Sequence, residues 1–335
     1  MKHLVGIVGF RGYSGMELHR ILERHPHIDP VLLEHRADVG EQSNLRRKAG
    51  PLRLPCTAEA AKEHGLAAVL LATPADVSIG LARAFLDVGV KVVDLSGAFR
   101  LQSPENYHRW YREEHMEPAL LAEAAYGLPE FCRSRIPGAR LVANPGCYPT
   151  AANLALKPLV AAGVIDRPAG IVCDAKSGVS GAGRKPSLKT SFCEVTENFS
   201  AYSILEHRHV PEVLMYSGIE EAEFSFTAQL LPLDRGILET IYFRSAKLES
   251  AAQLIDIYEA QYGEEPFVRL YEGGRVPDLR SVQHTNYCDI GVKFDGTTGR
   301  AVVVAAIDNL VKGAAGQAIQ NLNLILKRPE TEGLL

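Results

Sequence analysis

The stretch that decides the fold is residues 4–22, which read LVGIVGFRGYSGMELHRIL. Residues 4–8 form an apolar run typical of a buried parallel strand, and residues 16–22 have helical spacing. Glycines three residues apart between them would let the backbone approach a pyrophosphate lying on the helix N-terminus. This arrangement predicts a dinucleotide-binding turn, the alternative being a tight turn without a ligand. The cofactor-binding residues predicted here are Gly9, Arg11, Gly12, Tyr13, Ser14 and Gly15.

Strands and helices alternate through the residues that follow. Apolar runs at residues 31–33, 67–74 and 90–96 are typical of buried strands. Residues 77–88, between two of these runs, have helical spacing. The alternation predicts right-handed βαβ units and an α/β fold with a parallel sheet. Such sheets bind ligands beyond the carboxyl ends of their strands, so Arg100 is a candidate ligand for an anion, or else an ordinary surface arginine.

Two charged residues bear on the identity of the cofactor. Glu34 lies about twenty residues past the glycines, where an acidic side chain would bind the ribose 2′-hydroxyl of NAD. Arg36 stands two residues further on, where an arginine would bind the 2′-phosphate of NADP. Either could also be a solvated loop charge. The residues alone leave the choice of cofactor open.

A cysteine stands in a second turn, within residues 142–150, which read VANPGCYPT. An apolar run ends at Asn144, a Pro-Gly turn follows, and Pro149 opens an alanine-rich run of helical character. Proline is tolerated in the first turn of a helix, where its missing N–H would have no partner. Cys147 is therefore predicted at a helix N-terminus, where the dipole and unpaired N–H groups favour a reactive thiolate. A small buried residue in a turn is the alternative.

Beyond residue 150 the strands are separated by polar loops. Residues 170–175 predict a strand, which leads into KSGVSGAGRK at residues 176–185. Glycines and hydroxyls beside two basic side chains can form a nest of donors for a phosphate or carboxylate. Ser180, Arg184 and Lys185 are therefore candidate substrate ligands, the alternative being a flexible linker.

Two histidines follow in the segment EHRHVPE at residues 206–212. In an extended segment His207 and His209 would share one face, whereas on a helix they would not. Both are therefore candidates for acid–base chemistry. A metal site would need further ligands that are not found nearby in the sequence, so no metal is predicted.

The last part of the chain predicts more strands and a final helix. Residues 224–230 and 238–243 alternate like antiparallel strands around a turn at residues 234–236. Residues 301–307 predict a late buried strand, and residues 309–320 a helix rich in small residues.

Bulk composition limits the class of function. The chain has 335 residues, 46% hydrophobic and 23% charged, which is typical of a globular protein of about two domains. A formal net charge of −4 gives no basic surface for nucleic acid. The six cysteines are scattered without a CxxC pair, which is typical of a reducing cytosol. No signal peptide or membrane-spanning run is found, so we expect a cytoplasmic protein with no membrane partner.

Seven motifs, in the same order and over nearly the whole chain, resemble those of the N-acetyl-γ-glutamyl-phosphate reductase family. They are GFRGYSGMEL at 9–18, DLSGAFR at 94–100, YGLPE at 126–130, NPGCYP at 144–149, DAKSGVSGAGRK at 174–185, HRHVPE at 207–212 and IDNLVKGAAGQAIQNLN at 307–323. Together they are far more specific than any glycine pattern alone.

The resemblance implies an NADPH-dependent enzyme of arginine biosynthesis, with a fold like that of aspartate-semialdehyde dehydrogenase. Residues 1–146 and 309–335 would form a Rossmann-type dinucleotide-binding domain. Residues 147–308 would form an α+β domain for catalysis and oligomerisation, giving a homodimer or homotetramer that acts on a small acyl phosphate. Cys147 would be the nucleophile, with His209 and His207 as acid–base residues. The cofactor site would also include Ser177, Gly178 and Asn309.

Other functions would use only part of these features. A related reductase could act on aspartyl or aminoadipyl phosphate, although HRHVPE and GFRGYSG disfavour the aspartyl substrate. A catalytically silent NADP-binding sensor has no need of a thiol at Cys147. A cysteine hydrolase has no need of a dinucleotide turn.

Overall fold

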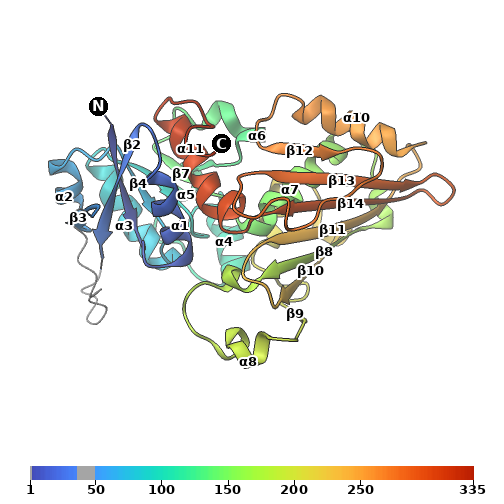
Figure 1. Cartoon of the computed structure of the whole chain (residues 1–335), viewed down its shortest axis with the longest axis horizontal. Helices are drawn as coiled ribbons and strands as arrows, with labels where there is room; N and C mark the ends of the chain where they lie inside the picture. Colours follow the sequence, from blue (N-terminus) through green and yellow to red (C-terminus); the bar gives the residue numbers. More distant parts are fainter. Residues whose placement is uncertain (1, 36–49) are drawn as a thin grey trace. The chain divides into compact units, whose positions relative to one another are not determined.

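The computed structural model describes residues 2–35 and 50–335. Arg36, the candidate ligand for the 2′-phosphate of NADP, lies outside the described residues. The chain divides into two compact units, each built on a seven-stranded sheet (Figure 1). The first unit comprises Met1–Pro104, Glu114–Asn144 and Ala318–Leu335, and the second comprises Glu105–Glu113 and Pro145–Gln317. The predicted class, a parallel α/β sheet with a second α+β unit, is confirmed.

The first unit is a parallel sheet with strand order β3-β2-β1-β4-β5-β7-β6. Its strands are β1 (His3–Val8), β2 (Ile28–Glu34), β3 (Leu52–Pro55), β4 (Ala68–Leu71), β5 (Lys91–Asp94), β6 (Ala125–Tyr126) and β7 (Leu141–Ala143). Its helices include α1 (Tyr13–Leu22), α2 (Ala58–Glu63), α3 (Ala75–Asp87), α5 (Pro118–Glu123) and α6 (Pro129–Cys132). The strand order reverses between β1 and β4, which is the point at which open parallel sheets bind ligands.

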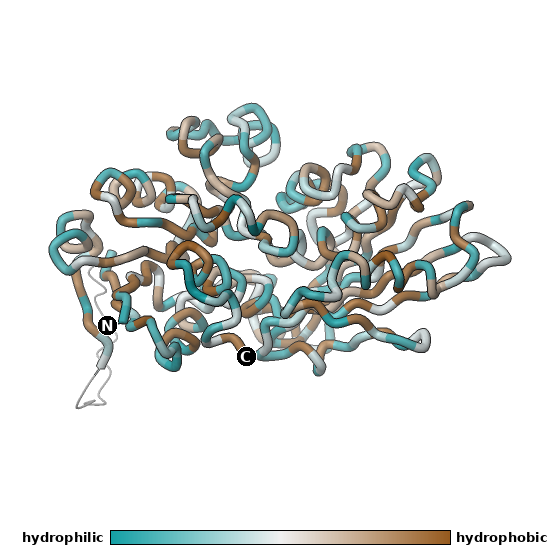
Figure 2. Tube along the Cα trace, turned by 90° about the horizontal axis from the view of Figure 1, so that it is seen from above, coloured by the Kyte–Doolittle hydropathy of each residue, from teal (hydrophilic) through white to brown (hydrophobic). Residues whose placement is uncertain are grey.

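The strands of this sheet are apolar for a physical reason. Parallel strands with crossover helices are covered on both faces, so their side chains are buried in an unbroken run. All four residues of β4 are buried, as are the last four of β1. Figure 2 shows hydrophobic stretches, in brown, alternating with hydrophilic ones, in teal, along the chain. The strands and helices predicted between residues 4 and 96 are thus confirmed as β1, β2, β4 and β5 and as α1 and α3.

The second unit is a mixed sheet with strand order β12-β13-β14-β11-β8-β10-β9. Its strands are β8 (Ile171–Gly178), β9 (Ser200–Tyr202), β10 (Phe224–Leu231), β11 (Ile237–Arg244), β12 (Val268–Tyr271), β13 (Cys288–Asp295) and β14 (Arg300–Ile307). Its helices include α4 (Pro104–Tyr111), α7 (Cys147–Ala161), α8 (Phe192–Val195), α9 (Val210–Ser217) and α10 (Ala251–Tyr262). Helix α7 contacts β11 and β14 and is buried along most of its length.

The antiparallel pair expected around residues 234–236 is wrong in its pairing. Strands β10 and β11 both form, but β8 lies between them, parallel to β10 and antiparallel to β11. The turn that joins β10 to β11 bonds instead to the end of β8. The amide of Gly178 donates to Gly236 O at 2.9 Å, and the amide of Ser180 to Asp234 O at 3.0 Å. Alternation predicted two strands but carried no information about which strand would lie between them.

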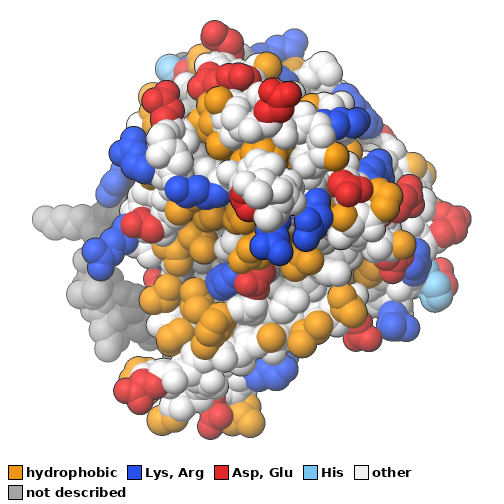
Figure 3. Space-filling model, turned by 90° about the vertical axis from the view of Figure 1, so that its right-hand side faces the viewer, with side chains coloured by type: hydrophobic (Ala, Val, Ile, Leu, Met, Phe, Trp, Pro, Cys, Tyr) orange, Lys and Arg blue, Asp and Glu red, His pale blue; other side chains and the backbone are white. Residues whose placement is uncertain are grey.

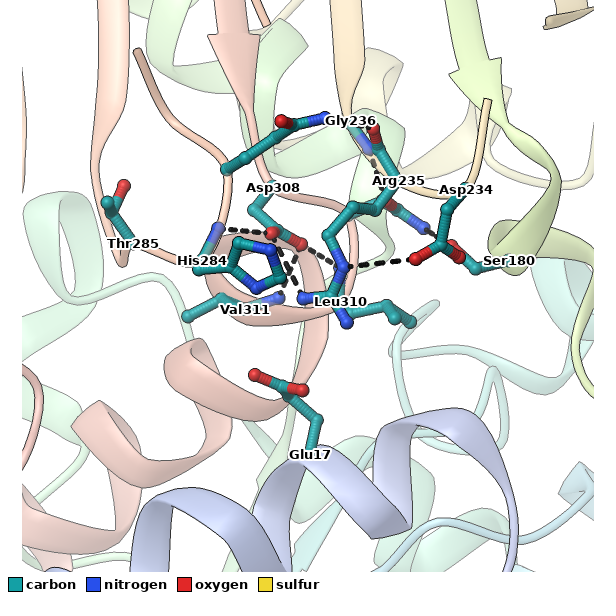
Figure 4. A network of polar contacts seen from close by, with 12 residues as sticks. Glu17, Ser180, Asp234, Arg235, Gly236, His284, Thr285, Asp308, Leu310 and Val311 are labelled. Carbon is teal, nitrogen blue, oxygen red and sulfur yellow. Dashed lines mark hydrogen bonds and ion pairs between the residues drawn. The ribbon is translucent and has the colours of Figure 1, made fainter. Parts of the chain in front are cut away.

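The helix predicted at residues 309–320 forms with an irregular start. A π-helical turn, η6 (Val311–Ala315), leads into α11 (Gly316–Ile325). The carboxylate of Asp308 accepts from the backbone amides of Leu310 and Val311 at 2.8 and 3.2 Å, which caps this start (Figure 4). Turns of π-helix are rare and are frequent at functional sites.

Two further observations concern the described residues as a whole. No helix among them is both long and apolar enough to cross a membrane. Within the same residues there is no group of three or more His, Cys, Asp or Glu side chains that could hold a metal ion. All six cysteines lie in the described part of the chain, and none of them forms a disulfide there.

Candidate active site

Cys147 is the first residue of α7, with Gly146 as its N-cap. The predicted position at a helix N-terminus is therefore confirmed. The turn is fixed by hydrogen bonds: the amide and hydroxyl of Thr150 donate to Gly146 O at 3.0 and 2.9 Å. The amide of Gly146 donates to Oε2 of the buried Glu212 at 2.9 Å. The thiol thus stands where the helix dipole favours an anion.

Glycine at position 146 is required by side chains that come from α9 and the turn before it. A Cβ at this position would lie 2.8 Å from Nε2 of His209 and 2.9 Å from Oε1 of Glu212. Real Cβ atoms do not approach other atoms so closely, so the absence of a side chain lets both groups reach the turn before Cys147. The glycine that looks like a turn signal in the sequence is therefore also a packing requirement of the site.

A second glycine lies against the nucleophile from η6. A Cβ at Gly313 would lie 2.9 Å from the Cβ of Cys147 and 3.2 Å from a methyl carbon of Ile307. The π-helical turn consequently packs its backbone directly against the cysteine. The motif at residues 307–323 therefore lies in contact with the residue that carries the thiol.

The two histidines meet at the site, although the segment that carries them is not extended. Residues 208 and 209 form a turn, and α9 begins at Val210 with His209 as its N-cap in the helical region of φ and ψ. Of the two alternatives, an extended segment or a helix, the extended segment is not what forms. Proline is accepted in the first turn of α9, where its missing N–H costs nothing. The two imidazole rings still lie together, with centroids 4.9 Å apart.

His207 is buried and supports its neighbour. Its Nδ1 accepts a hydrogen bond from the backbone amide of His209 at 3.2 Å, which leaves the proton on Nε2. Burial, helped by the charge of Arg208, lowers the pKa of His207 to about 4. A histidine with so low a pKa is neutral near pH 7 and is a weak base there.

Two tyrosines complete the wall around the histidines. The ring of Tyr148 meets those of His207 and His209 edge to face, at centroid distances of 5.3 and 6.1 Å. Its hydroxyl lies 3.1 Å from that of Tyr202 on β9. Burial, together with the nearby Tyr202, raises the pKa of Tyr148, so this phenol is neutral and can serve as a hydrogen-bond donor.

These residues line a cavity of about 650 Å³ within the second unit. Cys147, His207 and His209 line it together with Ser177 and Gly178, which the sequence assigned to the cofactor. The cavity is also lined by two basic residues that sequence analysis did not select, Lys189 and Arg208, and by segments of residues 181–206. A volume of this size is in the range of sites for small molecules.

The remaining candidates from the loop after β8 are divided between the surface and the interior. Arg184 and Lys185 are exposed and are not among the residues that line the cavity. Ser180 is buried, and its hydroxyl accepts from Nδ2 of Asn309 at 3.0 Å. Oδ1 of Asn309 accepts from the amide of Gly236 at 2.7 Å. Ser180 and Asn309 thus brace the turn behind the cavity.

Asp308, next to Asn309, extends this brace (Figure 4). It is fully buried, and besides capping η6 it accepts from the amide of His284 at 2.6 Å and from Nη1 of Arg235 at 3.2 Å. The network therefore joins three separate segments: the end of β14, the β10–β11 connection and the chain before β13. Asp308 caps η6, and η6 contains Gly313, which packs against Cys147.

In the first unit the glycine turn has the geometry that a pyrophosphate requires. Gly9 has φ of 78°, and a Cβ there would lie 2.2 Å from Ala72 O. A Cβ at Gly15 would lie 2.2 Å from Gly9 O. A Cβ at Gly12 would have one neighbour within 4 Å, Gly9 O at 3.4 Å. The turn ends at α1, which begins with Tyr13 and Ser14. This arrangement fits a dinucleotide phosphate at the helix N-terminus.

A cleft of about 270 Å³ opens beside that turn. It is lined by Gly9, Phe10, Arg11 and Gly12, by the end of β2, and by residues that follow β2 and β4. Glu34 lies in it with two cations nearby: Nη1 of Arg53 at 3.1 Å and Nη2 of Arg11 at 3.9 Å. The acidic residue at the end of β2 is therefore accompanied by positive charge.

Arg100 lies in the first unit and is almost fully buried. Its Nε donates to Asn144 O and its Nη2 to Leu95 O, both at 2.8 Å. The loop that carries it is held by Asp94, whose carboxylate accepts from the amide and hydroxyl of Ser96. Burial raises the pKa of Asp94, and these hydrogen bonds oppose that rise. The reading of Arg100 as an ordinary surface arginine is wrong.

Comparison with known proteins decides the family. Residues 4–139 match the family described as "Semialdehyde dehydrogenase, NAD binding domain", and residues 147–309 match "Semialdehyde dehydrogenase, dimerisation domain". The chain is 48% identical to the N-acetyl-gamma-glutamyl-phosphate reductase of Desulforudis audaxviator, over 99% of this chain and 97% of the relative. It belongs to the N-acetyl-γ-glutamyl-phosphate reductase family. The relative of that name from Symbiobacterium thermophilum is 46% identical over the same shares of both chains.

Solved structures share the fold of this reductase family member at low identity. Aspartate semialdehyde dehydrogenase II from Vibrio cholerae, complexed with ASA, superposes with a TM-score of 0.72 at 18% identity, over 98% of this chain and 99% of that one. The aspartate semialdehyde dehydrogenase with NADP from Candida albicans gives 0.67 at 17% identity, over the same shares. These likenesses show the fold, which agrees with the expectation from the motifs.

Several residues at the site were missed in the sequence. Glu212 stands at the end of the segment EHRHVPE and Tyr148 in the turn of Cys147, and neither has a sequence feature of its own that marks a site residue. Arg208 has a usable signal in the sequence, because it lies between two candidate histidines. Lys189 and Tyr202 carry no local pattern that marks a ligand, and chain folding alone brings them to the cavity.

Proposed function

We propose that this chain reduces N-acetyl-γ-glutamyl phosphate to N-acetylglutamate 5-semialdehyde and phosphate, with NADPH as the reductant, in arginine biosynthesis. The observation that carries the proposal is a cysteine at the N-terminus of α7, in a cavity that also holds two buried histidines. The names of the relatives from Desulforudis audaxviator and Symbiobacterium thermophilum support the same substrate.

The first half of the reaction uses Cys147 as nucleophile. Its thiolate sulfur bonds to the acyl carbon, the carbon–oxygen bond to phosphate breaks, and inorganic phosphate leaves with that electron pair. A thioester remains on the protein. An oxyanion formed on the way would be met by amides of the first turn of α7, an interaction worth about 3 kcal/mol per donor. The amide of Gly146 is committed to Glu212, and Pro149 has no amide hydrogen, so we assign this role to Cys147 and Tyr148.

His209 is our candidate for the base that takes the proton of the thiol. Its Nε2 approaches the turn at Gly146, and its backbone amide is held by His207. His207 is the weaker candidate because burial lowers its pKa to about 4. We therefore assign His207 a positioning role, in which its Nδ1 orients the chain that presents His209.

The second half of the reaction regenerates the thiolate. When bound, a nicotinamide supplies the hydride that reduces the thioester carbonyl. The carbon–sulfur bond then breaks, the aldehyde leaves, and the sulfur takes the electron pair. An imidazolium at His209 stabilises the departing thiolate and is ready for the next cycle.

Cationic residues would bind the phosphate and the carboxylate of the substrate by ion pairing. We propose Arg208 and Lys189 as ligands because they line the cavity. Ser180 is proposed to act indirectly, by holding the loop through Asn309. We further propose Arg100 as a ligand of the departing phosphate, since its hydrogen bonds to two backbone carbonyls fix the orientation of its guanidinium.

NADPH is our proposed cofactor, bound by the glycine turn of the first unit. Arg11 and Arg53 near Glu34 support a phosphate-bearing ribose, because they offset the carboxylate that would repel it. Arg36 is proposed as the direct ligand of the 2′-phosphate. Replacing Arg36 with Ala should weaken NADPH binding by roughly 1.5–3 kcal/mol and leave NADH almost unchanged. Equal affinity of the wild type for both cofactors would assign the ribose to Glu34 instead.

The proposed function also implies a role for each domain, an oligomeric state and a cellular location. We propose that residues 1–146 with 309–335 bind the cofactor, and that residues 147–308 carry catalysis and self-association. The chain would act as a homodimer or homotetramer in the cytoplasm. The description of residues 147–309 as a dimerisation domain supports the self-association.

A reverse assay tests the proposed function. N-acetylglutamate 5-semialdehyde, phosphate and NADP are mixed with the protein, and reduced cofactor is followed by absorbance. We expect continuous formation of reduced cofactor only when phosphate is present, because phosphate must attack the thioester and displace the thiolate of Cys147 before the next turnover. Parallel forward assays then compare kcat/KM on N-acetylglutamyl, aminoadipyl and aspartyl phosphate, which differ in the carboxylate arm of the substrate. Turnover without phosphate, or a higher kcat/KM on another acyl phosphate, would contradict the proposal.

A further inference from the structure

A segment of the second unit combines exposed apolar side chains with one wall of the catalytic cavity. We define the strap as residues 187–199, which include η4 (Leu188–Thr190) and α8 and lead directly into β9. In Figure 1 this segment extends from β9 and β10 as a loop that carries α8. None of the chemical steps proposed above uses it as an acid, base or nucleophile.

One side of the strap is apolar and exposed. Leu188, Phe192 and Phe199 are 76%, 80% and 56% exposed. Because η4 contacts α8, Leu188 and Phe192 lie in neighbouring turns. Clusters of large exposed apolar side chains are uncommon on proteins that have no partner and mark surfaces of interaction.

The other side of the strap faces the cavity of Cys147. Its residues that line the cavity are mostly polar: Ser187, Lys189, Thr190, Glu194, Val195 and Asn198. Phe192 and Glu194 therefore belong to one short helix but to different surfaces. Phe192 and Glu194 are less than one helical turn apart, so a contact made by Phe192 would also restrict the position of Glu194 in the cavity wall.

The strap is held in shape by hydrogen bonds within itself. The hydroxyls of Ser187 and Thr190 lie 2.9 Å apart, and Nδ2 of Asn198 donates to Glu194 O at 2.9 Å. The hydrogen bonds described for residues 187–199 all join residues of this segment. Local bonds fix the shape of the strap, and the hydrogen bonds described for it do not attach it to the rest of the cavity wall.

We propose that a second copy of this chain covers the apolar side of the strap and thereby completes the substrate cavity. The region that contains the strap, residues 147–309, matches a family described as a dimerisation domain. The strap also continues into β9, the edge strand of a sheet that exposes further apolar side chains. Val172 on β8 and Tyr242 on β11 are directly paired and both exposed. Figure 3 shows hydrophobic side chains, in orange, gathered over the lower part of one face of the molecule.

This inference deepens the proposed function and rests on it for its kinetic readout. The partner copy holds the strap, and the strap holds Lys189 and its neighbours against the substrate. Substrate binding then depends on self-association, whereas the reactivity intrinsic to Cys147 and His209 does not need the strap. Loss of the contact should therefore raise KM more than it lowers kcat.

The test uses the full chain and the double variant Leu188→Ser with Phe192→Ser. Met116→Ser is the matched control, because Met116 is 77% exposed and lies in the first unit. Oligomer size is measured by sedimentation velocity, and KM and kcat by reduction of N-acetyl-γ-glutamyl phosphate. Alkylation of Cys147 by iodoacetamide, followed on its own peptide by mass spectrometry, reports the cavity without any turnover. Phe192→Leu, which keeps an apolar side chain, serves as the conservative variant.

The double variant should form a smaller oligomer than the wild type and show at least a ten-fold higher KM. Its Cys147 should alkylate at least five-fold faster, because the wall of the cavity is loosened. Met116→Ser and Phe192→Leu should stay within two-fold of the wild type in all three measurements. An unchanged oligomer, or a smaller oligomer with unchanged KM and alkylation, would overturn the inference. A wild type without reductase activity would remove the proposed function, while sedimentation and alkylation would still decide the role of the strap.

Discussion

Two strand-to-helix turns carry the candidate function, and they are built in opposite ways. In the turn from β1 to α1 the backbone makes the site: Cβ atoms at Gly9 and Gly15 would each lie 2.2 Å from a carbonyl oxygen. In the turn before α7 side chains make the site, since Cys147 supplies the thiol while His209 and Glu212 crowd Gly146. Both turns use glycine at a helix N-terminus, but for different neighbours.

The difference teaches where the information for each site is stored. The backbone site is encoded within seven consecutive residues, because a turn of glycines and a helix start are local properties. The side-chain site is assembled from α7, α9, β8 and η6, which are separated by tens of residues along the chain. Changes in the first turn should therefore act on cofactor binding, and changes in the second on chemistry.

The largest effect is expected from Cys147→Ser. A hydroxyl titrates far above neutrality and is a much poorer nucleophile, so kcat should fall by roughly 10⁴-fold or more. NADPH affinity, measured by fluorescence titration, should stay within two-fold because the glycine turn is untouched. Cys132→Ser is the control, since this cysteine forms no disulfide and lies in the first unit. Appreciable activity in Cys147→Ser would remove the covalent mechanism.

Gly15→Ala should produce the converse phenotype. A Cβ 2.2 Å from Gly9 O forces the turn open, so we expect NADPH binding to weaken by roughly 100-fold, or about 2.7 kcal/mol. Alkylation of Cys147 should remain as in the wild type. Gly80→Ala, where a Cβ meets nothing within 4 Å, should bind NADPH normally. If Gly15→Ala also bound NADPH normally, the turn would not be the site of the pyrophosphate.

The two histidines should differ in their effect on the reactivity of Cys147. A base beside Cys147 should bring the inflection of its alkylation rate below the pH of about 8.5 at which free cysteine titrates. We expect this inflection to rise towards that value in His209→Asn and to move little in His207→Asn. The rate at pH 7 should fall by roughly ten-fold in the former. A rise in His207→Asn alone would exchange the two roles, and no rise in either would leave α7 as the only activator.

The remaining effect is on stability and not on activity, and it comes from burial of His207. The pKa of His207 is about 4 in the folded chain, and its ordinary value of 6.5 applies to the unfolded chain. At a pH between these two values the unfolded chain therefore binds more protons than the folded chain. The free energy of unfolding therefore falls as pH falls through this window, by about 2 kcal/mol between pH 7 and pH 5 for this residue.

Urea unfolding of the wild type and of His207→Gln at both pH values checks this contribution. Burial also lowers the pKa of His25 and His115, so the wild type has other losses in the same window. The variant keeps those losses and should lack only the part due to His207. An equal decline in both proteins would mean that His207 is not buried as a neutral ring.

The sequence predicts those parts of the fold whose signals are local. The strands at residues 4–8 and 90–96 and the helix start at Cys147 are confirmed, because burial on both faces and a Pro-Gly turn leave marks in consecutive residues. The pairing of β10 with β11 is wrong because alternation does not say which strand lies next to which.

The candidate site is predictable to the same extent. Cys147, Ser177 and the two histidines line one cavity, although the histidines do so from a turn and a helix start and not from an extended strand. Arg184 was selected for its charge beside glycines, yet it is exposed, while Lys189 in the same loop reaches the cavity. Which of several basic residues faces inward depends on the path of the strap, and no local pattern specifies that path.

The central claim, a covalent thioester on Cys147, is tested most directly by mixing the protein with N-acetyl-γ-glutamyl phosphate in the absence of cofactor. We predict a burst of inorganic phosphate of about one per active site, and an acyl group on the Cys147 peptide detected by mass spectrometry. Addition of NADPH should discharge that acyl group as the semialdehyde. Absence of both the burst and the adduct, in a preparation that turns over normally once NADPH is added, would contradict the account.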